Sequence, residues 1–525
     1  MTGNRIELCA EGMALDRLEC LAHGGQLALS EQVQERVRGS HERLQRYLEE
    51  DRQIYGVTTG YGPLADTQVG SQYSAQLQHN LIAHLSAGVG DPLSPLQTRA
   101  TMAARISALA RGHSGVSPAT LDALIHCLNE DALPVVPAMG TVGASGDLTP
   151  LAHIAGALMG YGQMRHHGGD PEPSDRVLAR IGQPGFEPGG KDALALVNGT
   201  SAMTGIAGLN GSAVERALRW SALLTAGHGI VLNVHLEAWD PALGELRPHP
   251  GQQRVHGWLN RLIASGSDDP TDSGRVARDR VTRLDAPIQD PYSLRCAPQL
   301  LGAVSDQLSW HNTTVTTELN SVTDNPVLPD DRDSVLHGGN FYGQHVAFAS
   351  DALANAVITL AVHAERRIAR LSNVRLNQGL PAFLQPLDTG LNSGFMGAQV
   401  TASALLAEMR TQAVPASIQS IPTNGDNQDV VTMGTIGARR TAHLISLLER
   451  LLAIDALMVA QALELRGETV HRSDPVDQLH SWVRGHAPAL ETDRALSGEI
   501  EHLAECIGAP GGLTDCMSAF DGATQ

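Results

Sequence analysis

The chain has 525 residues, more than one hydrophobic core usually supports, so we expect two or three structural units. Hydrophobic residues make up 42% of the sequence but aromatic residues only 3%, so Leu, Ala, Val and Ile must fill the core, as they do in packed helices. The formal net charge is −19, which is not the basic footprint of a nucleic-acid-binding protein. The composition favours a mainly α-helical protein and argues against nucleic acid as a partner.

The cysteines follow no recognisable metal-site or disulfide pattern. They are scattered and include no C-x-x-C pair, which argues against both a disulfide framework and a zinc site. Their positions are Cys9, Cys20, Cys127, Cys296, Cys506 and Cys516. The N-terminal segment has no basic stretch followed by an apolar run, and no segment approaches ~18 consecutive apolar residues. We therefore expect a soluble, cytoplasmic protein with reduced thiols, no bound metal and no membrane contact.

The predicted elements, in chain order, are mostly helices. Ser94 is an N-cap candidate followed by Pro at the first helical position, and Gly112 is the expected stop of that helix. In the segment 351–371, apolar residues recur every three or four positions and line one face. The run 436–466 is apolar around more of its circumference, as expected for a central helix of a bundle.

Segments rich in Gly and Pro indicate how the chain is divided. The segments 168–190 and 265–273 are interpreted as surface excursions between helical blocks. We expect an irregular, loop-rich N-terminal unit over residues 1–202, a long central helical bundle over 203–507 and a C-terminal tail over 508–525.

A glycine-rich turn occupies residues 140–150, with glycine at every third position around small residues, so the backbone can adopt conformations that a Cβ forbids. A phosphate-binding loop would need a different spacing, and the carboxylate of Asp147 would repel a phosphate. Ser145 stands one residue out of the G-x-S-x-G pattern, so a serine hydrolase is only a distant alternative. For a shorter match, a plain tight turn before a helix capped by Asp147 would be the better interpretation.

The whole string Gly140–Pro150, with the following Leu-Ala-His, resembles the signature of the histidine, phenylalanine and tyrosine ammonia-lyase family. In this family, Ala-Ser-Gly cyclises to 4-methylideneimidazol-5-one (MIO). The resemblance implies that the Gly146 nitrogen attacks the Ala144 carbonyl and that Ser145 loses its hydroxyl, two dehydrations that leave an exocyclic methylene. Such an attack requires a strained backbone. The implied cofactor is MIO formed autocatalytically from Ala144-Ser145-Gly146, with no metal and no PLP.

Six further segments match the same family in the same order, over about residues 50 to 440. They are Tyr55–Gly62, Val197–Thr200, Gln289–Cys296, Asp324–Pro326, Gly338–Phe341 and Asn424–Asp429. The resemblance implies an ammonia-lyase or fumarase-like helical fold and a homotetramer whose active sites combine loops from three subunits. It thereby accounts for the distance in sequence between these motifs.

The resemblance also assigns catalytic roles. The substrate amine would add to the methylidene carbon, which turns nitrogen into a better leaving group, and Tyr55 would take the β-proton. A phenol has an ordinary pKa near ~10, so the site must favour the phenolate. Arg295 resembles the residue that clamps the substrate carboxylate. Asn198 and Tyr292 resemble the groups that hydrogen-bond the prosthetic ring and the developing negative charge.

The residues expected around the substrate are Gly62, His84, Leu85, Gln289, Asn325, Phe341, Asn424 and Gln428. Among them, Gln289 and Asn325 would support the carboxylate end, and Phe341 would pack beside the cofactor. Taken singly, each residue has an ordinary structural interpretation, since a lone Asn or Gln is usually a turn or cap residue.

The pair His84-Leu85 resembles the tyrosine-selective pattern, in which the imidazole hydrogen-bonds a phenolic hydroxyl. Histidine-specific members instead carry Ser-His here and Glu at the position of Gln428, so histidine is disfavoured. We expect elimination of ammonia from L-tyrosine to give trans-p-coumarate by a carbon–nitrogen lyase, with partial activity on phenylalanine.

Other functions stay open at this point: a phenylalanine or histidine ammonia-lyase, a tyrosine 2,3-aminomutase, or a non-catalytic structural oligomer. The segment 424–426 resembles that of tyrosine 2,3-aminomutases, which keep the cinnamate in place for ammonia to add again, and retention depends on loop dynamics. The intact Tyr55, Ser145 and Arg295 argue against the structural oligomer.

Overall fold

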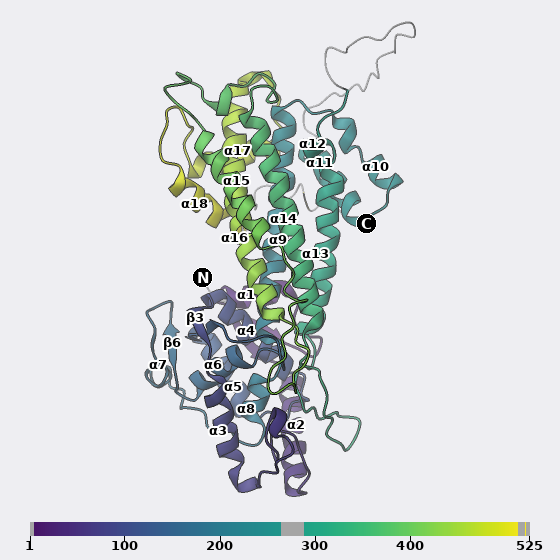
Figure 1. Cartoon of the computed structure of the whole chain (residues 1–525), viewed down its shortest axis with the longest axis vertical. Coiled ribbons are helices and arrows are strands. Elements are labelled where there is room, and N and C mark those ends of the chain that lie inside the picture. The colour runs from purple at the N-terminus through teal and green to yellow at the C-terminus, as the bar shows by residue number, and fades with distance from the viewer. Residues whose placement is uncertain (1–4, 264–287, 513–519, 521–525) are drawn as a thin grey trace. The chain divides into compact units, whose positions relative to one another are not determined.

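The computed structural model describes residues 5–263, 288–512 and 520 (Figure 1). Helices dominate these residues and strands are few and short, which confirms the mainly α-helical fold predicted from composition. The segment 265–273 and most of the expected tail 508–525 lie outside the described residues.

Residue contacts divide the chain into two compact units that interleave along the sequence. Unit 1 comprises Met1–Ser212, Trp310–Ala352 and Pro415–Ala442. Unit 2 comprises Ala213–Ser309, Leu353–Val414 and His443–Gln525. Four long helices contribute residues to both units: α9 (Ser201–Val231), α13 (Ala297–Leu319), α14 (Gln344–Ser372) and α16 (Gly434–Arg466). The domain boundaries expected at residues 202 and 507 stay predictions.

Unit 1 combines short helices with three small sheets. Its helices are α1 (Leu15–Ala22), α2 (Glu31–Glu49), α3 (Ser74–Leu85), α4 (Pro95–Leu109), α5 (Pro118–Asn129), α6 (Leu148–Leu158), α7 (Ser174–Arg180) and α8 (Asp192–Val197), with 3-10 turns η1 (Gly62–Leu64) and η2 (Ser71–Tyr73). The parallel pair is β1 (Arg5–Leu8) with β2 (Gln26–Leu29), and an antiparallel pair is β3 (Val89–Pro92) with β5 (Pro137–Met139). The third sheet is antiparallel, in the order β4 (Ala132–Pro134), β6 (Gln163–His166), β7 (Glu172–Pro173).

Helix α4 lies in the core of unit 1, and it begins where the sequence predicts. The Ser94 side chain accepts from the Gln97 amide and the Gln97 side chain accepts from the Ser94 amide, which forms a capping box with Pro95 at the first helical position. The helix ends at Leu109, and Gly112 follows with φ +76°. Every residue from Thr98 to Leu109 is buried.

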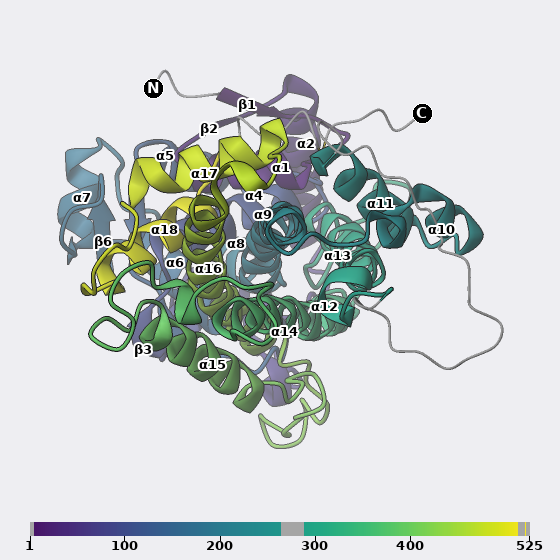
Figure 2. The ribbon, with the colours of Figure 1, turned by 90° about the horizontal axis from the view of Figure 1, so that it is seen from above.

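Unit 2 is built on parts of the four long helices, which run side by side (Figures 1 and 2). The face of α14 predicted from periodicity is fully buried, from Leu353 to Leu371, and α16 is buried around its circumference from Leu451 to Leu463, as predicted for a central helix. The other helices of this unit are α10 (Pro241–Leu246), α11 (Pro250–Ile263), α12 (Tyr292–Arg295), α15 (Met396–Thr411), α17 (Asp474–His486) and α18 (Ser497–Gly508), with 3-10 turns η3 (Leu236–Trp239), η4 (Ala382–Leu384) and η5 (Gly467–Thr469).

A buried ionic cluster joins three of the long helices within unit 2. The Asp455 carboxylate of α16 accepts from Arg367 Nη2 of α14 at 2.7 Å and lies 2.6 Å from His228 Nε2 of α9. All three side chains are fully buried. Removing one partner would leave an uncompensated buried charge, so the cluster constrains which residues of these helices can face each other.

Among the described helices, α14 alone is long and apolar enough to cross a membrane by length and composition. Its most apolar window has a mean hydropathy of 1.5, and 61% of that window is buried inside the structure. The apolar character of α14 is therefore accounted for by packing within the protein core.

Candidate active site

The glycine-rich turn connects β5 to α6 in unit 1 and has a backbone that few residue types allow. Ser145 has a φ of +53°, in the left-handed region that a residue with a Cβ rarely adopts, and Gly143 and Gly146 each have a φ of +77°. A Cβ added to Gly143 would lie 2.2 Å from Thr432 Oγ1, and one added to Gly146 would lie 2.2 Å from the Gly199 carbonyl oxygen. The positive φ angles and the close approach of neighbouring atoms both require glycine at positions 143 and 146.

Asp147 fastens the end of this turn to two helices. Its fully buried carboxylate accepts from the Met203 amide at 2.8 Å and from the Thr435 hydroxyl. These donors lie in the first turns of α9 and α16, where free amides and the helix dipole favour a negative charge. Burial raises the pKa of Asp147 to about 6, and hydrogen bonds from Thr435, Met203 and Ala202 oppose this shift. Asp147 occupies the N-cap position of α6, but its side chain makes no capping hydrogen bond to that helix.

Asn198 and Gly199 also form hydrogen bonds with the glycine-rich turn. It follows the last residue of α8, and its Nδ2 donates to the Ser145 carbonyl oxygen at 3.0 Å. Gly146 and Gly199 form a parallel β-bridge, and the Asp147 amide donates to the Gly199 carbonyl at 2.7 Å. Asn198 Oδ1 is buried and has no hydrogen-bond partner among the described residues. The side chain thus keeps one acceptor free beside Ser145.

Gln428 approaches the Ser145 side chain. Its Nε2 donates to Ser145 Oγ at 3.2 Å, and its Oε1 accepts from the Thr423 hydroxyl at 2.7 Å. Thr423 and Gln428 also form an antiparallel bridge, which closes the loop between them. In the described part of the chain, the Ser145 hydroxyl is thus bonded by an amide and not by a histidine, which removes support for the hydrolase alternative.

Tyr55 and Tyr61 form a second pair of polar groups. Tyr55 Oη accepts from the Gly62 amide at 2.8 Å. The two rings are edge to face, with centroids 6.4 Å apart. Tyr61 Oη accepts from Gln78 Nε2 at 3.0 Å, and burial raises the pKa of Tyr61 well above its usual range. Tyr61 therefore stays a neutral phenol.

These groups open into one cavity of about 760 Å³ within unit 1. Helices α3, α6 and α8, which pack against one another, supply most of its apolar wall. The lining residues that the sequence predicts are Tyr55, Gly62, His84, Leu85, Ala144, Ser145, Asn198, Asn325, Phe341, Asn424 and Gln428. The sequence assigned no role to the other lining residues, which are Gly60, Tyr61, Pro63, Leu64, Leu77, Leu81, Leu148, Leu194, Tyr342, Asn427, Asp429 and Val430. Leu77 and Leu81 could have been found, because they precede His84 and Leu85 at helical spacing on α3.

His84 lines the cavity and is bonded to the backbone of its own helix. Its Nδ1 lies 2.9 Å from the Asn80 carbonyl oxygen. A carbonyl can only accept, so Nδ1 carries a hydrogen. In the tautomer with hydrogen on Nδ1 alone, Nε2 is a hydrogen-bond acceptor.

A buried ion pair includes the residue that precedes Asn325, which lines the cavity. Lys191 and Asp324 form a fully buried ion pair, and burial lowers the pKa of Lys191. The neighbouring Asn325 accepts from the Gly338 amide at 2.7 Å through its Oδ1. These contacts connect the motif at 324–326 to the one at 338–341, so that Asn325 and Phe341 line the same cavity.

Three predicted residues belong to unit 2 and do not line the cavity. Gln289 precedes α12, and Tyr292 and Arg295 are the first and last residues of that helix. The Arg295 guanidinium carbon lies 4.7 Å from the centroid of the Tyr292 ring, and Tyr292 is 70% exposed. Arg295 Nε is buried without a partner among the described residues. No Arg or Lys occurs among the described residues that line the cavity.

A helical protein whose cavity unites a strained Ala-Ser-Gly turn with a tyrosine fits a class of lyases, and comparison with known proteins identifies the family. The family model "Aromatic amino acid lyase" matches residues 13–485. A tyrosine ammonia-lyase of Cereibacter sphaeroides is 48% identical over 504 residues, with 93% of this chain and 95% of that protein covered. A histidine ammonia-lyase of Gloeobacter violaceus is 40% identical over 515 residues, with 97% of each covered.

Solved structures agree with the family match. The crystal structure of tyrosine aminomutase from Streptomyces globisporus superimposes with a TM-score of 0.92 at 34% identity and covers 99% of this chain and 100% of that one. The chain belongs to the aromatic amino acid lyase family and is an enzyme of the ammonia-lyase, or carbon–nitrogen lyase, class. This family uses the MIO prosthetic group.

We predict that Asp147→Asn loosens the glycine-rich turn, because the amide offers one acceptor where the carboxylate offers two. The loss of a hydrogen bond to a buried charged group corresponds to about 1–3 kcal/mol, so hydrogen exchange of the 140–147 amides should become roughly 5- to 160-fold faster. Mass spectrometry of deuterated peptides measures this. All samples carry Ser145→Ala so that the turn has the same covalent structure, and exposed Asp175→Asn is the control. Unchanged exchange in Asp147→Asn would remove Asp147 as the anchor.

Proposed function

We propose that this enzyme eliminates ammonia from L-tyrosine to give trans-p-coumarate and that it acts in the cytoplasm. The observation that carries the proposal is the acceptor nitrogen of His84 beside an apolar wall in the cavity that also contains Ser145. An acceptor at this place can bond the hydrogen of a phenol, and a phenylalanine ring would leave it unpaired. The tyrosine ammonia-lyase among the relatives, at 48% identity, supports the same substrate.

We infer that Ala144, Ser145 and Gly146 form the MIO group in this chain. The positive φ of Ser145 and the absence of a Cβ at Gly146 suit a turn that must close on itself. The oxygen that the ring would retain is the Ser145 carbonyl oxygen, to which Asn198 Nδ2 already donates. When formed, the group supplies an electrophile for the substrate amine. Asn198 would stabilise negative charge on the ring oxygen, as a preorganised donor does.

Tyr55 is the proposed base for the β-proton. Tyr55 lines the cavity together with Ser145, and its oxygen accepts a hydrogen bond from the Gly62 amide. It therefore lies in the cavity where a group that takes a proton from the substrate is needed. Tyr61 is unsuited to this role, because burial keeps it neutral. The apolar side chains of Leu81 and Leu85 would hold the substrate ring and exclude water.

The carboxylate end of the substrate requires a cation, and we propose that another subunit supplies it. The cavity has no Arg or Lys among its described lining residues. Within the described part of the chain, Arg295 has a buried Nε without a hydrogen-bond partner, and the neighbouring Tyr292 is exposed. A homotetramer in which Gln289, Tyr292 and Arg295 of one chain serve the cavity of another would meet this need, because the arginine fork matches a carboxylate.

Two alternatives remain for the reaction and the substrate. The structural likeness to a tyrosine aminomutase, together with the segment 424–426, favours a tyrosine 2,3-aminomutase as the second candidate. Histidine is a weaker candidate. The amide of Gln428 bonds Ser145 and Thr423, so no carboxylate stands at this position to pair with an imidazolium.

We predict that the purified protein converts L-tyrosine to p-coumarate and ammonia, and that Ser145→Ala abolishes the conversion because no electrophile can form. Ultraviolet absorbance measures p-coumarate, and chromatography measures β-tyrosine. The intact mass should be lower than the sequence mass by two water molecules in the wild type only.

Accumulation of β-tyrosine as the main product would make the enzyme a mutase. The lyase proposal is refuted by an absence of turnover with tyrosine, phenylalanine and histidine. Wild-type turnover by Ser145→Ala would instead exclude the self-made electrophile.

We predict that His84→Phe shifts preference from tyrosine toward phenylalanine by roughly 1–3 kcal/mol in the ratio of kcat/KM values, because the acceptor for the phenolic hydroxyl is removed. Initial rates with both substrates give the ratio. The matched control is His79→Phe on the same helix, since His79 bonds Tyr161 and does not line the cavity. An unchanged ratio in His84→Phe would show that His84 does not recognise the hydroxyl.

We predict that Tyr55→Phe and Arg295→Met each abolish most activity but complement one another when the two chains are co-expressed. If each site takes its base and its cation from different chains, random assembly leaves about a quarter of the sites intact. Specific activity of the purified mixed oligomer is compared with that of each variant alone. Absence of recovery in a verified mixed oligomer would place both groups in one chain's site.

A further inference from the structure

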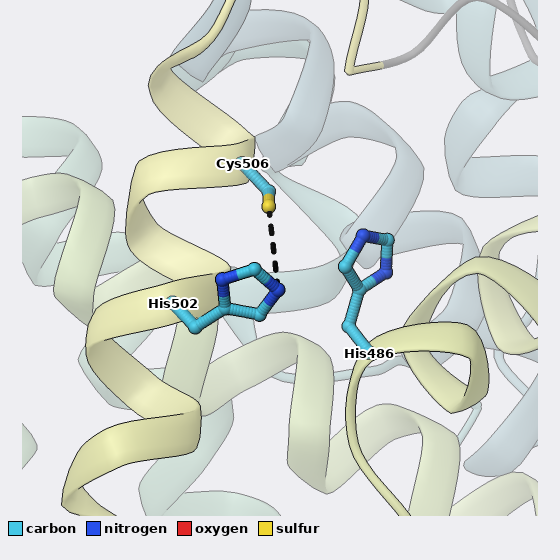
Figure 3. A group of neighbouring side chains, drawn as sticks. All are labelled: His486, His502 and Cys506. Atoms are coloured by element: carbon cyan, nitrogen blue, oxygen red, sulfur yellow. Dashed lines mark hydrogen bonds between the residues drawn. The ribbon is translucent and has the colours of Figure 1, made fainter.

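Three side chains of unit 2 with metal-binding atoms converge, and none of them belongs to the cavity lining. His486 is the last residue of α17, and His502 and Cys506 lie on α18. Figure 3 shows the two imidazole rings and the thiol directed toward a common space between the helices. One ligand atom from each residue lies within 4.8 Å of the other two.

The spacing of these atoms is close to that of a metal site. A tetrahedral zinc ion binds nitrogen near 2.0–2.1 Å and sulfur near 2.3 Å, so neighbouring ligand atoms lie roughly 3.3–3.6 Å apart. Cys506 Sγ and His502 Nε2 are already 3.8 Å apart. The remaining difference can be closed by small rotations of side chains, without movement of a helix.

Local structure explains the convergence of the pair on α18. Residues four apart in an α-helix lie on the same face one above the other, so His502 and Cys506 project together. Two ligands at this spacing on one helix are a recurrent arrangement in zinc proteins. The absence of a C-x-x-C pair is therefore no argument against a site here, because one cysteine and two histidines can supply three ligands from two helices.

His486 is held with the correct nitrogen available. Its Nδ1 lies 2.8 Å from the Trp482 carbonyl oxygen, which can only accept, so Nδ1 carries the hydrogen and Nε2 carries the lone pair. Metal-binding histidines commonly donate their other ring N–H to a carbonyl in this manner. The ring also packs on Trp482 with a centroid distance of 4.6 Å, and Trp482 packs on Trp220. The orientation of His486 is thus set before any ion binds.

We propose that His486, His502 and Cys506 bind one divalent transition-metal ion, with zinc as the preferred metal and water as the fourth ligand. Two nitrogen ligands and one sulfur ligand suit Zn²⁺ better than Mg²⁺ or Ca²⁺, which select oxygen. His502 is exposed, so water can reach the open position. Cys506 binds as the thiolate and its proton passes to solvent. The ion joins the end of α17 to α18, and its role is to stabilise this pair of helices.

The test uses untagged, full-length protein stripped of metal with a chelator and titrated with Co²⁺ as a spectroscopic probe for zinc. We expect one Co²⁺ per chain, visible-region bands typical of tetrahedral coordination and a near-ultraviolet band from the sulfur–cobalt bond. Zn²⁺ should displace Co²⁺ and raise the melting temperature, because a ligand that binds only the folded state stabilises it.

Variants decide whether these side chains are the ligands. Cys506→Ser should lose the sulfur–cobalt band, and His502→Gln, at an exposed position, should weaken Co²⁺ binding at least tenfold while the protein stays folded. Cys20→Ser is the matched control and should bind as the wild type does. Failure of the wild type to develop the sulfur–cobalt band would overturn the proposal, as would undiminished binding by both variants. Ammonia-lyase activity is measured in parallel, and its presence or absence leaves these outcomes unchanged.

Discussion

The buried carboxylate of Asp147 is the interaction on which the candidate site depends. The Asp147 carboxylate accepts hydrogen bonds from the first turns of two long helices. In this way it holds the turn, whose backbone is strained at Ser145. Strain persists only where surrounding structure over-determines it. Ionising a carboxylate inside the protein is unfavourable, which the raised pKa of Asp147 expresses. The N-termini of two helices reduce the free-energy cost of ionising this carboxylate. The turn is therefore held by hydrogen bonds to the first turns of both helices.

The described lining of the cavity carries hydrogen-bonding groups but no Arg or Lys. Tyr55, His84 and the Asn198 amide that donates to the Ser145 carbonyl all belong to this lining. Among the described residues of unit 2, Arg295 Nε is buried without a hydrogen-bond partner. The proposed exchange of residues between identical chains would explain both observations.

Local features of this fold could be predicted from sequence, and long-range partners could not. The capping box at Ser94 and the buried face of α14 follow from spacing within one helix, and both are present. Tyr55 and Asn198 were predicted as site residues only because the segments that contain them resemble motifs of a known family. By contrast, Thr435 lies 288 positions from Asp147, and no local pattern links the two. The grouping of His486 with His502 and Cys506 could not be predicted for the same reason, because His486 lies on a different helix from the other two.

The hydrogen bond from Gln428 to the Ser145 hydroxyl connects the formation of the proposed prosthetic group with the binding of the proposed substrate. Under the proposed chemistry, that hydroxyl departs while the prosthetic group forms, and a donor on its oxygen makes it a better leaving group. The same side chain lines the cavity that is proposed to hold the substrate. Under that proposal, a substitution of Gln428 would alter both the formation of the prosthetic group and the binding of the substrate.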